Sequence, residues 1–210
     1  SVHTLNLVIN YSDTSITTIT ACDSLVWNGN TYDSSGTYYY NGDTNLYSLC
    51  FDGVNDYLQL QNTNSSNITS LVIETSFKLL AYPDNTGQEG MVFYAEELYN
   101  NLIRECELYF NKNTGNLEFS INNQLEYVTY DYYNFNLGQW YLLRAEYNGS
   151  GYLNLYVDSN LVATQLVLTP YLNFDDVVLG SLLQYNEYFN GCLDDFKVSV
   201  NGTSLLNWNF

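Results

Sequence analysis

The chain has 210 residues, with 23 Asp and Glu against 5 Lys and Arg, which gives a formal net charge of −18. A sequence with so few bases excludes binding to the phosphate backbone of nucleic acid, because that attraction requires clustered cations. The length allows one sandwich with a full core plus a small appendage, and no apolar run approaches the roughly 20 residues of a membrane span, so no membrane insertion is expected.

Residues 1–46 are rich in Thr, Ser, Tyr and Asn and predict short strands joined by tight turns. Leu5–Ile9 is one such strand, and the Asn-Gly step within Trp27–Tyr32 predicts a hairpin, because both turn positions require a positive φ. An N-terminal strand such as Leu5–Ile9 is also a candidate for self-association, by addition to the sheet of a neighbouring molecule.

From Leu46 onward the hydrophobic period is two, which indicates half-buried strands of antiparallel sheets. The clearest runs are 71–79, 117–122 and 153–158, and the turns between strands are rich in Asn and Gly. The segment Tyr94–Arg104 lacks a helix cap and predicts a strand followed by a loop. We therefore expect an all-β protein, with two antiparallel sheets packed as a jelly-roll sandwich and a small N-terminal β appendage.

Two distant segments, Phe51–Tyr57 and Gly191–Val198, resemble the first and last strands of the laminin-G-like family of concanavalin A-like lectins. The Trp-led run Leu137–Leu143 and the run Leu153–Asp158 follow in the order of that family, although Ser159 replaces the glycine that ends the second run. The resemblance implies that residues 47–210 form a lectin sandwich that binds a glycan or a cell-surface polysaccharide.

Residues 1–46 resemble part of a tandem repeat found in large surface adhesins of Bacteroidetes-type bacteria. The similar segments are Thr20–Ser24, Trp27–Tyr32 and Ser35–Tyr38. This second resemblance implies an extracellular or cell-surface location, and it carries no information about a ligand.

Four aspartates are candidate metal ligands. In the laminin-G-like family the paired first and last strands commonly hold calcium, which implies Asp52 and Asp194 as ligands, with Asp56 and Asp195 as further candidates. Calcium takes six to eight oxygen ligands, mostly carboxylates and carbonyls. Aspartates beside glycine also bond turn amides, and strand alternation places Asp194 and Asp195 on opposite faces.

Catalysis has few candidate residues. His3 is the only histidine and lies in the appendage, which excludes histidine-based nucleophile schemes in the main domain. Glu105 and Glu107 share one face of a predicted strand, and a pair of carboxylates is what glycoside hydrolysis requires. The longer motif of laminarinase-like enzymes is missing, because Tyr109 stands where that motif continues.

Tyrosine and phenylalanine in loop-like stretches are candidates for a platform on which sugar rings stack. Two sets are possible and the sequence does not choose between them, while Trp140 is expected in the core. The sets are Tyr130, Tyr132, Tyr133 and Phe135, or Tyr185, Tyr188 and Phe189.

The cysteines Cys22, Cys50, Cys106 and Cys192 form no CxxC pair, so disulfides or free thiols are expected. The resemblance to the tandem repeat implies a Cys22–Cys50 bridge, which we favour. The alternative bridge joins Cys50 and Cys192, which lie on the two strands expected to be neighbours.

The sequence thus predicts an extracellular, calcium-assisted carbohydrate-binding or adhesion module of a bacterial surface protein, without enzymatic activity. A structural subunit that assembles filaments by strand addition is the first alternative. A glycoside hydrolase that uses Glu105 and Glu107 is the second.

Overall fold

The computed structural model divides the chain into two units, Ser1–Thr44 and Asn45–Phe210. It describes residues 25–27, 30–32, 48–60, 67–83, 89–99, 102–122, 124–168, 172–173, 176–182 and 187–208. The strand Leu5–Ile9 lies outside the described residues, so self-association through it stays a prediction. The boundary predicted between domains 1–46 and 47–210 also stays a prediction.

The described residues of the first unit form an antiparallel pair, β1 (Leu25–Trp27) and β2 (Asn30–Tyr32). Trp27 is paired with Asn30, so the two strands are joined by the Asn-Gly step. This pairing confirms the predicted hairpin.

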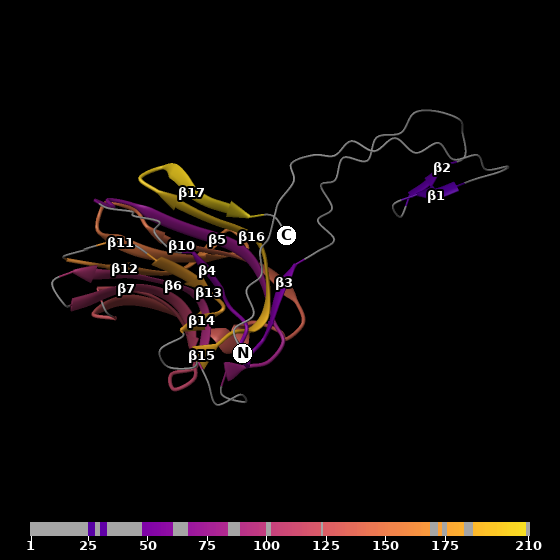
Figure 1. The fold of residues 1–210 in the computed structure, drawn as a ribbon, viewed down its shortest axis with the longest axis horizontal. Helices are drawn as coiled ribbons and strands as arrows, with labels where there is room; N and C mark the ends of the chain where they lie inside the picture. The colour runs from indigo at the N-terminus through magenta and orange to yellow at the C-terminus, as the bar shows by residue number, and fades with distance from the viewer. Residues whose placement is uncertain are drawn as a thin grey trace. The chain divides into compact units, whose positions relative to one another are not determined.

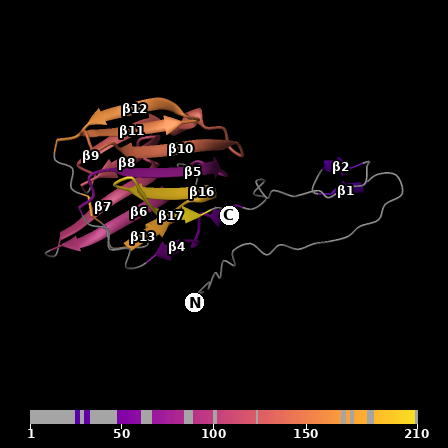
Figure 2. The same cartoon turned by 90° about the horizontal axis from the view of Figure 1, so that it is seen from above.

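The second unit contains two large antiparallel sheets, which lie in two layers (Figure 1). The seven-stranded sheet has the order β12-β11-β10-β5-β16-β17, with β3 also paired to β16, and most of this order is visible in Figure 2. Its strands are β3 (Leu49–Asp52), β5 (Leu71–Leu79), β10 (Trp140–Tyr147), β11 (Tyr152–Val157), β12 (Asn160–Leu166), β16 (Asn190–Val200) and β17 (Thr203–Trp208).

The six-stranded sheet has the order β4-β13-β6-β7-β8-β9. Its strands are β4 (Leu58–Leu60), β6 (Gly90–Tyr99), β7 (Leu102–Asn111), β8 (Asn116–Ile121), β9 (Glu126–Asp131) and β13 (Asp176–Leu179). A short pair, β14 (Ser181–Leu182) with β15 (Glu187–Tyr188), and one 3-10 turn, η1 (Tyr132–Asn134), complete the described elements. The predicted all-β, two-sheet jelly-roll sandwich is confirmed.

The core lies between the two sheets because each strand turns alternate side chains inward. In β5 the burial alternates along the whole strand, and Ile73 and Phe77 are fully buried. The ring of Phe77 packs against Phe110 of β7 and Tyr141 of β10. Side chains of both sheets therefore meet in one cluster, and the opposite faces of both sheets point outward.

Strand β3 lies beside β16, so the first and last segments of the sandwich are neighbours, as the family resemblance implied. Phe51 is paired with Gly191 in this register. On its other side β16 approaches β5, and a Cβ atom at Gly191 would collide with the carbonyl oxygen of Lys78 there. This close approach of β16 to β5 therefore requires glycine.

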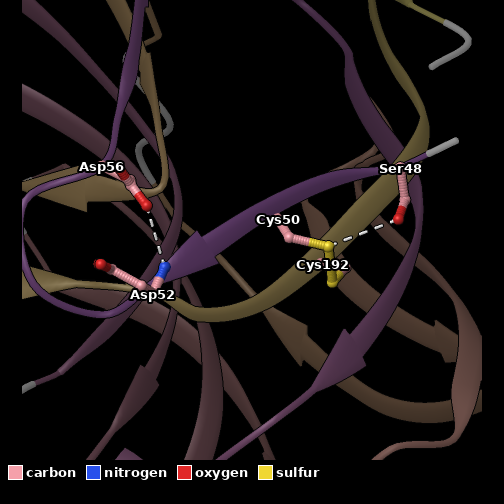
Figure 3. The surroundings of a disulfide bond; sticks show 5 residues. All are labelled: Ser48, Cys50, Asp52, Asp56 and Cys192. Carbon is pink, nitrogen blue, oxygen red and sulfur yellow. Dashed lines mark hydrogen bonds between the residues drawn. A yellow bond between two sulfur atoms is a disulfide. The ribbon is translucent and has the colours of Figure 1, made fainter.

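A disulfide joins Cys50 of β3 to Cys192 of β16, which stand directly opposite each other in the antiparallel register (Figure 3). The favoured Cys22–Cys50 pairing is therefore wrong, and the alternative is confirmed. The repeat resemblance misled the prediction because Cys50 belongs to the sandwich, where its cross-strand neighbour supplies the partner. Cys106 is a buried free thiol on the inner face of β7.

Two further predictions need correction. The segment predicted as a loop after Tyr94 is strand almost throughout, because Leu102–Arg104 begin β7 and pair with the end of β6. Trp140 is 40% exposed rather than in the core, and the ammonium of Lys78 lies 4.8 Å from the centre of its ring. Trp140 begins β10 on the outward side, where a cation covers its face.

Replacing both Cys50 and Cys192 with serine should lower the free energy of unfolding by about 2 to 5 kcal/mol, because the bridge closes a loop with a sequence separation of 142 residues. Denaturant titration measures this loss. The control is mass spectrometry of the unreduced wild-type protein, in which a peptide linking Cys22 to Cys50 would contradict the assigned pairing.

Candidate functional site

Asp52 ends β3, and Asp56 lies close to it in the turn that follows (Figure 3). The backbone N–H of Asp52 donates to Oδ2 of Asp56 over 3.1 Å, and the N–H of Val54 donates to Oδ1 of Asp52 over 2.8 Å. Gly53 between them has a φ of 79°. Asp52 and Asp56 therefore bond turn amides, the second role that aspartates beside glycine take.

Asp194 and Asp195 lie elsewhere on β16. Asp52 is opposite Asn190, whereas Asp194 is opposite Ser76, four residues further along the strand (190 to 194), or about 13 Å. The disulfide of Cys192 stands between the two positions.

A bulge at Asp194–Lys197 gives Asp195 a φ of 49° and turns it to solvent. Within the described part of the chain, no group of three or more His, Cys, Asp or Glu side chains is arranged to hold a metal ion. The four predicted aspartates therefore do not lie together as one cluster of carboxylates, and both their role as metal ligands and calcium itself stay predictions.

The outer face of the six-stranded sheet carries a second set of carboxylates. Alternation along β7 sends Cys106 and Leu108 into the core, and Glu105, Glu107 and Tyr109 to the outside. This confirms that Glu105 and Glu107 share a face.

Two cavities of about 360 and 370 Å³ lie on this face, and Tyr109, Asn111 and Gln124 line both of them. We call the two together the acidic groove. Its other lining residues are Glu89, Glu105, Glu107, Asn113, Leu182 and Glu187 in the first cavity, and Thr114, Asn116, Glu118, Tyr127 and Thr129 in the second.

Glu107 is the most deeply buried carboxylate of the groove, at 1% exposure. Its Oε2 accepts hydrogen bonds from Gln124 Nε2 at 2.8 Å and from Ser120 Oγ at 3.1 Å. Its Oε1 is buried and has no hydrogen-bond partner among the described residues. Burial, and then the charges of Glu105 and Glu89, raise the pKa of Glu107 to about 7, against the two hydrogen bonds, which lower it.

Tyrosine hydroxyls hold the neighbouring carboxylates. Tyr94 donates to Glu96 at 2.7 Å and lies 3.2 Å from Glu105, and Tyr109 donates to Glu118 at 2.9 Å. Burial and these carboxylates raise the pKa of both phenols, so both hydroxyls keep their protons and act as donors. The buried apolar cluster of Met91, Tyr94, Tyr109, Val178 and Leu182 fixes the two tyrosine rings on this outer face.

At one end of the groove, Glu89 precedes β6 and Glu187 begins β15. Burial and the charge of Glu187 raise the pKa of Glu89 to about 7, while the charge of Lys112 opposes the rise. Burial also raises the pKa of Glu187. The groove therefore holds carboxylates that are withdrawn from water and repel one another.

The predicted sugar platforms are only partly exposed, since Tyr133 is 53% exposed and Tyr130 and Tyr188 are half-buried. Tyr132, Phe135 and Phe189 are buried, because the Asp131 side chain caps η1 and the turn points Tyr132 inward. Tyr185 lies outside the described residues. Tyr127 of β9, which the sequence analysis did not single out, is 51% exposed and lines the second cavity. Its alternation with buried Val128 was the available signal.

A family model described as the concanavalin A-like lectin/glucanases superfamily matches residues 52–201, and it is of the laminin G type. The chain belongs to this superfamily. No curated protein has a sequence that matches it. The tandem-repeat resemblance of residues 1–46 stays a prediction.

Solved structures share the fold of this laminin G-like domain. Domains LG4-5 of the mouse laminin α1 chain align with a TM-score of 0.57 and 18% identity, over 77% of this chain and 44% of that one. A pentraxin from Limulus polyphemus aligns with a TM-score of 0.51 and 18% identity, over 72% and 74% of the two chains.

The ligand-binding domain of botulinum neurotoxin serotype D, in complex with N-acetylneuraminic acid, aligns with a TM-score of 0.56 and 18% identity, over 74% of this chain and 39% of that one. The match thus spans less than half of the laminin and neurotoxin chains. At these identities the likeness establishes the fold.

The buried carboxyl of Glu107 should make stability fall as pH rises. Its ordinary pKa is 4.5 and its folded pKa is about 7, so between these values the native state keeps a proton that the unfolded state releases, and raising the pH favours unfolding. Glu107→Gln should remove up to about 3 kcal/mol of this dependence. Denaturant titrations at a series of pH values measure the slope.

Asp131→Asn is the matched control, because Asp131 is exposed and asparagine also caps a turn. This variant should keep the wild-type slope. An unchanged slope in Glu107→Gln would contradict the assigned proton on Glu107.

Proposed function

We propose that the domain binds carbohydrate in the acidic groove. The observation that carries the proposal is Glu107, which lines a polar cavity and whose buried Oε1 has no hydrogen-bond partner among the described residues. A buried polar atom without a hydrogen bond is costly. A bound hydroxyl group would supply the missing bond, whether Glu107 accepts it as a carboxylate or donates to it as an acid.

The other groups of the groove suit a sugar. Asn111, Asn113 and Gln124 present amides, which both donate and accept hydrogen bonds. The half-exposed ring of Tyr127 offers an apolar face on which the C–H face of a sugar can stack. Specific polar groups around an aromatic surface are the usual composition of a small-molecule site. The similar neurotoxin domain, solved with N-acetylneuraminic acid, supports a binding role on this fold.

An extracellular location is part of the proposal. The Cys50–Cys192 bridge supports it, because disulfides persist in oxidising compartments. Within the described residues no helix is both long and apolar enough to span a membrane. Attachment to a bacterial surface and filament assembly stay predictions, since both were argued from the N-terminal segment.

Tyr127→Ala should weaken glycan binding about tenfold, or about 1.4 kcal/mol, because the variant removes the exposed ring while leaving the core intact. Calorimetric titration of a glycan selected on an array measures the affinity.

Tyr152→Ala is the matched control, since Tyr152 is 42% exposed on β11 of the other sheet. Equal losses in the two variants, or none in Tyr127→Ala, would contradict the proposed groove. Repeating the titration with calcium and then with a chelator tests the calcium prediction.

Hydrolysis of the bound glycan is the second candidate function, and one observation favours it. Glu107 holds its proton up to a pH of about 7, as a general acid must, and Glu105 lies on the same face. Under this alternative the wild type releases new reducing ends from the polysaccharide that it binds, and Glu107→Gln binds without release. Binding by the wild type without any release would exclude hydrolysis and leave the proposed function intact.

A further inference from the structure

The outward carboxylates of the two sheets differ in the number of cations that lie beside them. On the seven-stranded sheet, Arg144 bonds Glu74 at 2.9 Å and Glu146 at 3.1 Å, and Lys197 lies 3.8 Å from Glu74. Cations of the chain therefore compensate this face. The chain has 5 Lys and Arg in all, so each one placed there is lost to the rest of the surface.

The carboxylates of the acidic groove have far fewer positive charges beside them. Its first cavity is lined by Glu89, Glu105, Glu107 and Glu187, and no cation lines it among the described residues. Lys112 lies near enough to oppose the raised pKa values of Glu89 and Glu187, but it does not line the cavity. The carboxylates of the cavity therefore outnumber the charge available to balance them.

Burial makes this imbalance important. Charges withdrawn from water interact more strongly than exposed ones, and Glu107 is 1% exposed, with neighbours Glu105 and Glu89 that disfavour its ionised form. Its unpartnered Oε1 is a second, independent indication that a ligand atom belongs here. The missing partner is thus one that both donates a hydrogen bond and carries positive charge.

An ammonium group meets both requirements, since it has three donors and no acceptor. We propose that the ligand of the acidic groove is an amino-sugar polymer with free, protonated amines. This inference rests on the proposed carbohydrate-binding function. An amine enters the first cavity beside Glu107 and Glu105, while ring hydroxyls bond the amides of Asn111 and Gln124 and one sugar ring stacks on Tyr127. Acidic sugars are excluded, because the same carboxylates repel them.

Binding of such a ligand is linked to protonation. The groups around Glu107 come from several elements. They are Glu105 and Tyr109 on the same strand, Tyr94 opposite it on β6, Glu89 before β6, Ser120 on β8 and Gln124 before β9. An ammonium ion favours the ionised form of Glu107, so binding displaces the proton that Glu107 holds below a pH of about 7. Binding should therefore release protons to the buffer.

The test compares β-1,4-linked oligomers of equal length built from glucosamine, from N-acetylglucosamine and from glucose, within a panel that also holds other neutral, amino and acidic glycans. The glucosamine oligomer should bind at least about tenfold more tightly than the other two. Its affinity should fall as salt is added, because the attraction is electrostatic.

The outcomes separate the two proposals. Equal binding of charged and neutral oligomers, or binding confined to neutral or acidic members, overturns the amine inference and leaves carbohydrate binding standing. No binding to any member of the panel overturns both.

Variants locate the effect. Glu107→Gln and Glu89→Gln should each reduce the preference for the glucosamine oligomer over the glucose oligomer by about tenfold. Asp195→Asn removes one negative charge from the other sheet, at a position with a φ of 49° that asparagine tolerates, and should keep the preference. A preference that survives in both groove variants would overturn the inference. If Glu107→Gln does not fold, the preference is measured in Glu89→Gln alone, because Glu89 is only half-buried.

Discussion

The sandwich depends on the pairing of β16 with three other strands. β16 lies between β5 and β17 in the seven-stranded sheet and also pairs with β3. This arrangement turns Leu193, Phe196 and Val198 into the core, and the Cys50–Cys192 bridge ties the first strand of the unit to its last long one. Because the core is then complete between the sheets, the outer face of the six-stranded sheet is left to carry polar groups for another purpose.

Period-two alternation explains why most of the fold could be predicted. In β8 the hydrophobic side chains alternate without exception, and in β5 only Val72 and Thr75 depart from the alternation, so the sequence shows which face is buried. The same rule placed Glu105 and Glu107 together. It failed for Tyr132 and Phe135, because a single 3-10 turn capped by Asp131 points these rings inward, and a turn of that size has no period to detect.

The site was harder to predict because its parts come from separate segments. Gln124 lies in a turn, Glu89 precedes a strand and Glu187 lies on a short strand paired with β14. Their convergence depends on the packing of distant elements, which local patterns do not encode. For the aspartates, the sequence analysis instead predicted a closeness that is not found. Asp52 and Asp194 lie on neighbouring strands, but the register of the pairing separates them along β16. The sequence indicated which strands are neighbours but not their register, so it placed the two aspartates closer together than they are.

The acidic groove is costly for folding. A glutamine at position 107 would fill the same volume and keep hydrogen bonds to Ser120 and Gln124 without burying a charge. Stability alone therefore does not account for a carboxylate there, and sequences break such local rules mainly at functional sites. Two of the five bases lie on the other sheet as ion-pair partners, where Arg144 and Lys197 pair with Glu74. The carboxylates of the acidic groove are withdrawn from water and lack matching cations, whereas those of the other sheet are paired. This difference is what we expect of a binding face whose ligand brings the positive charge.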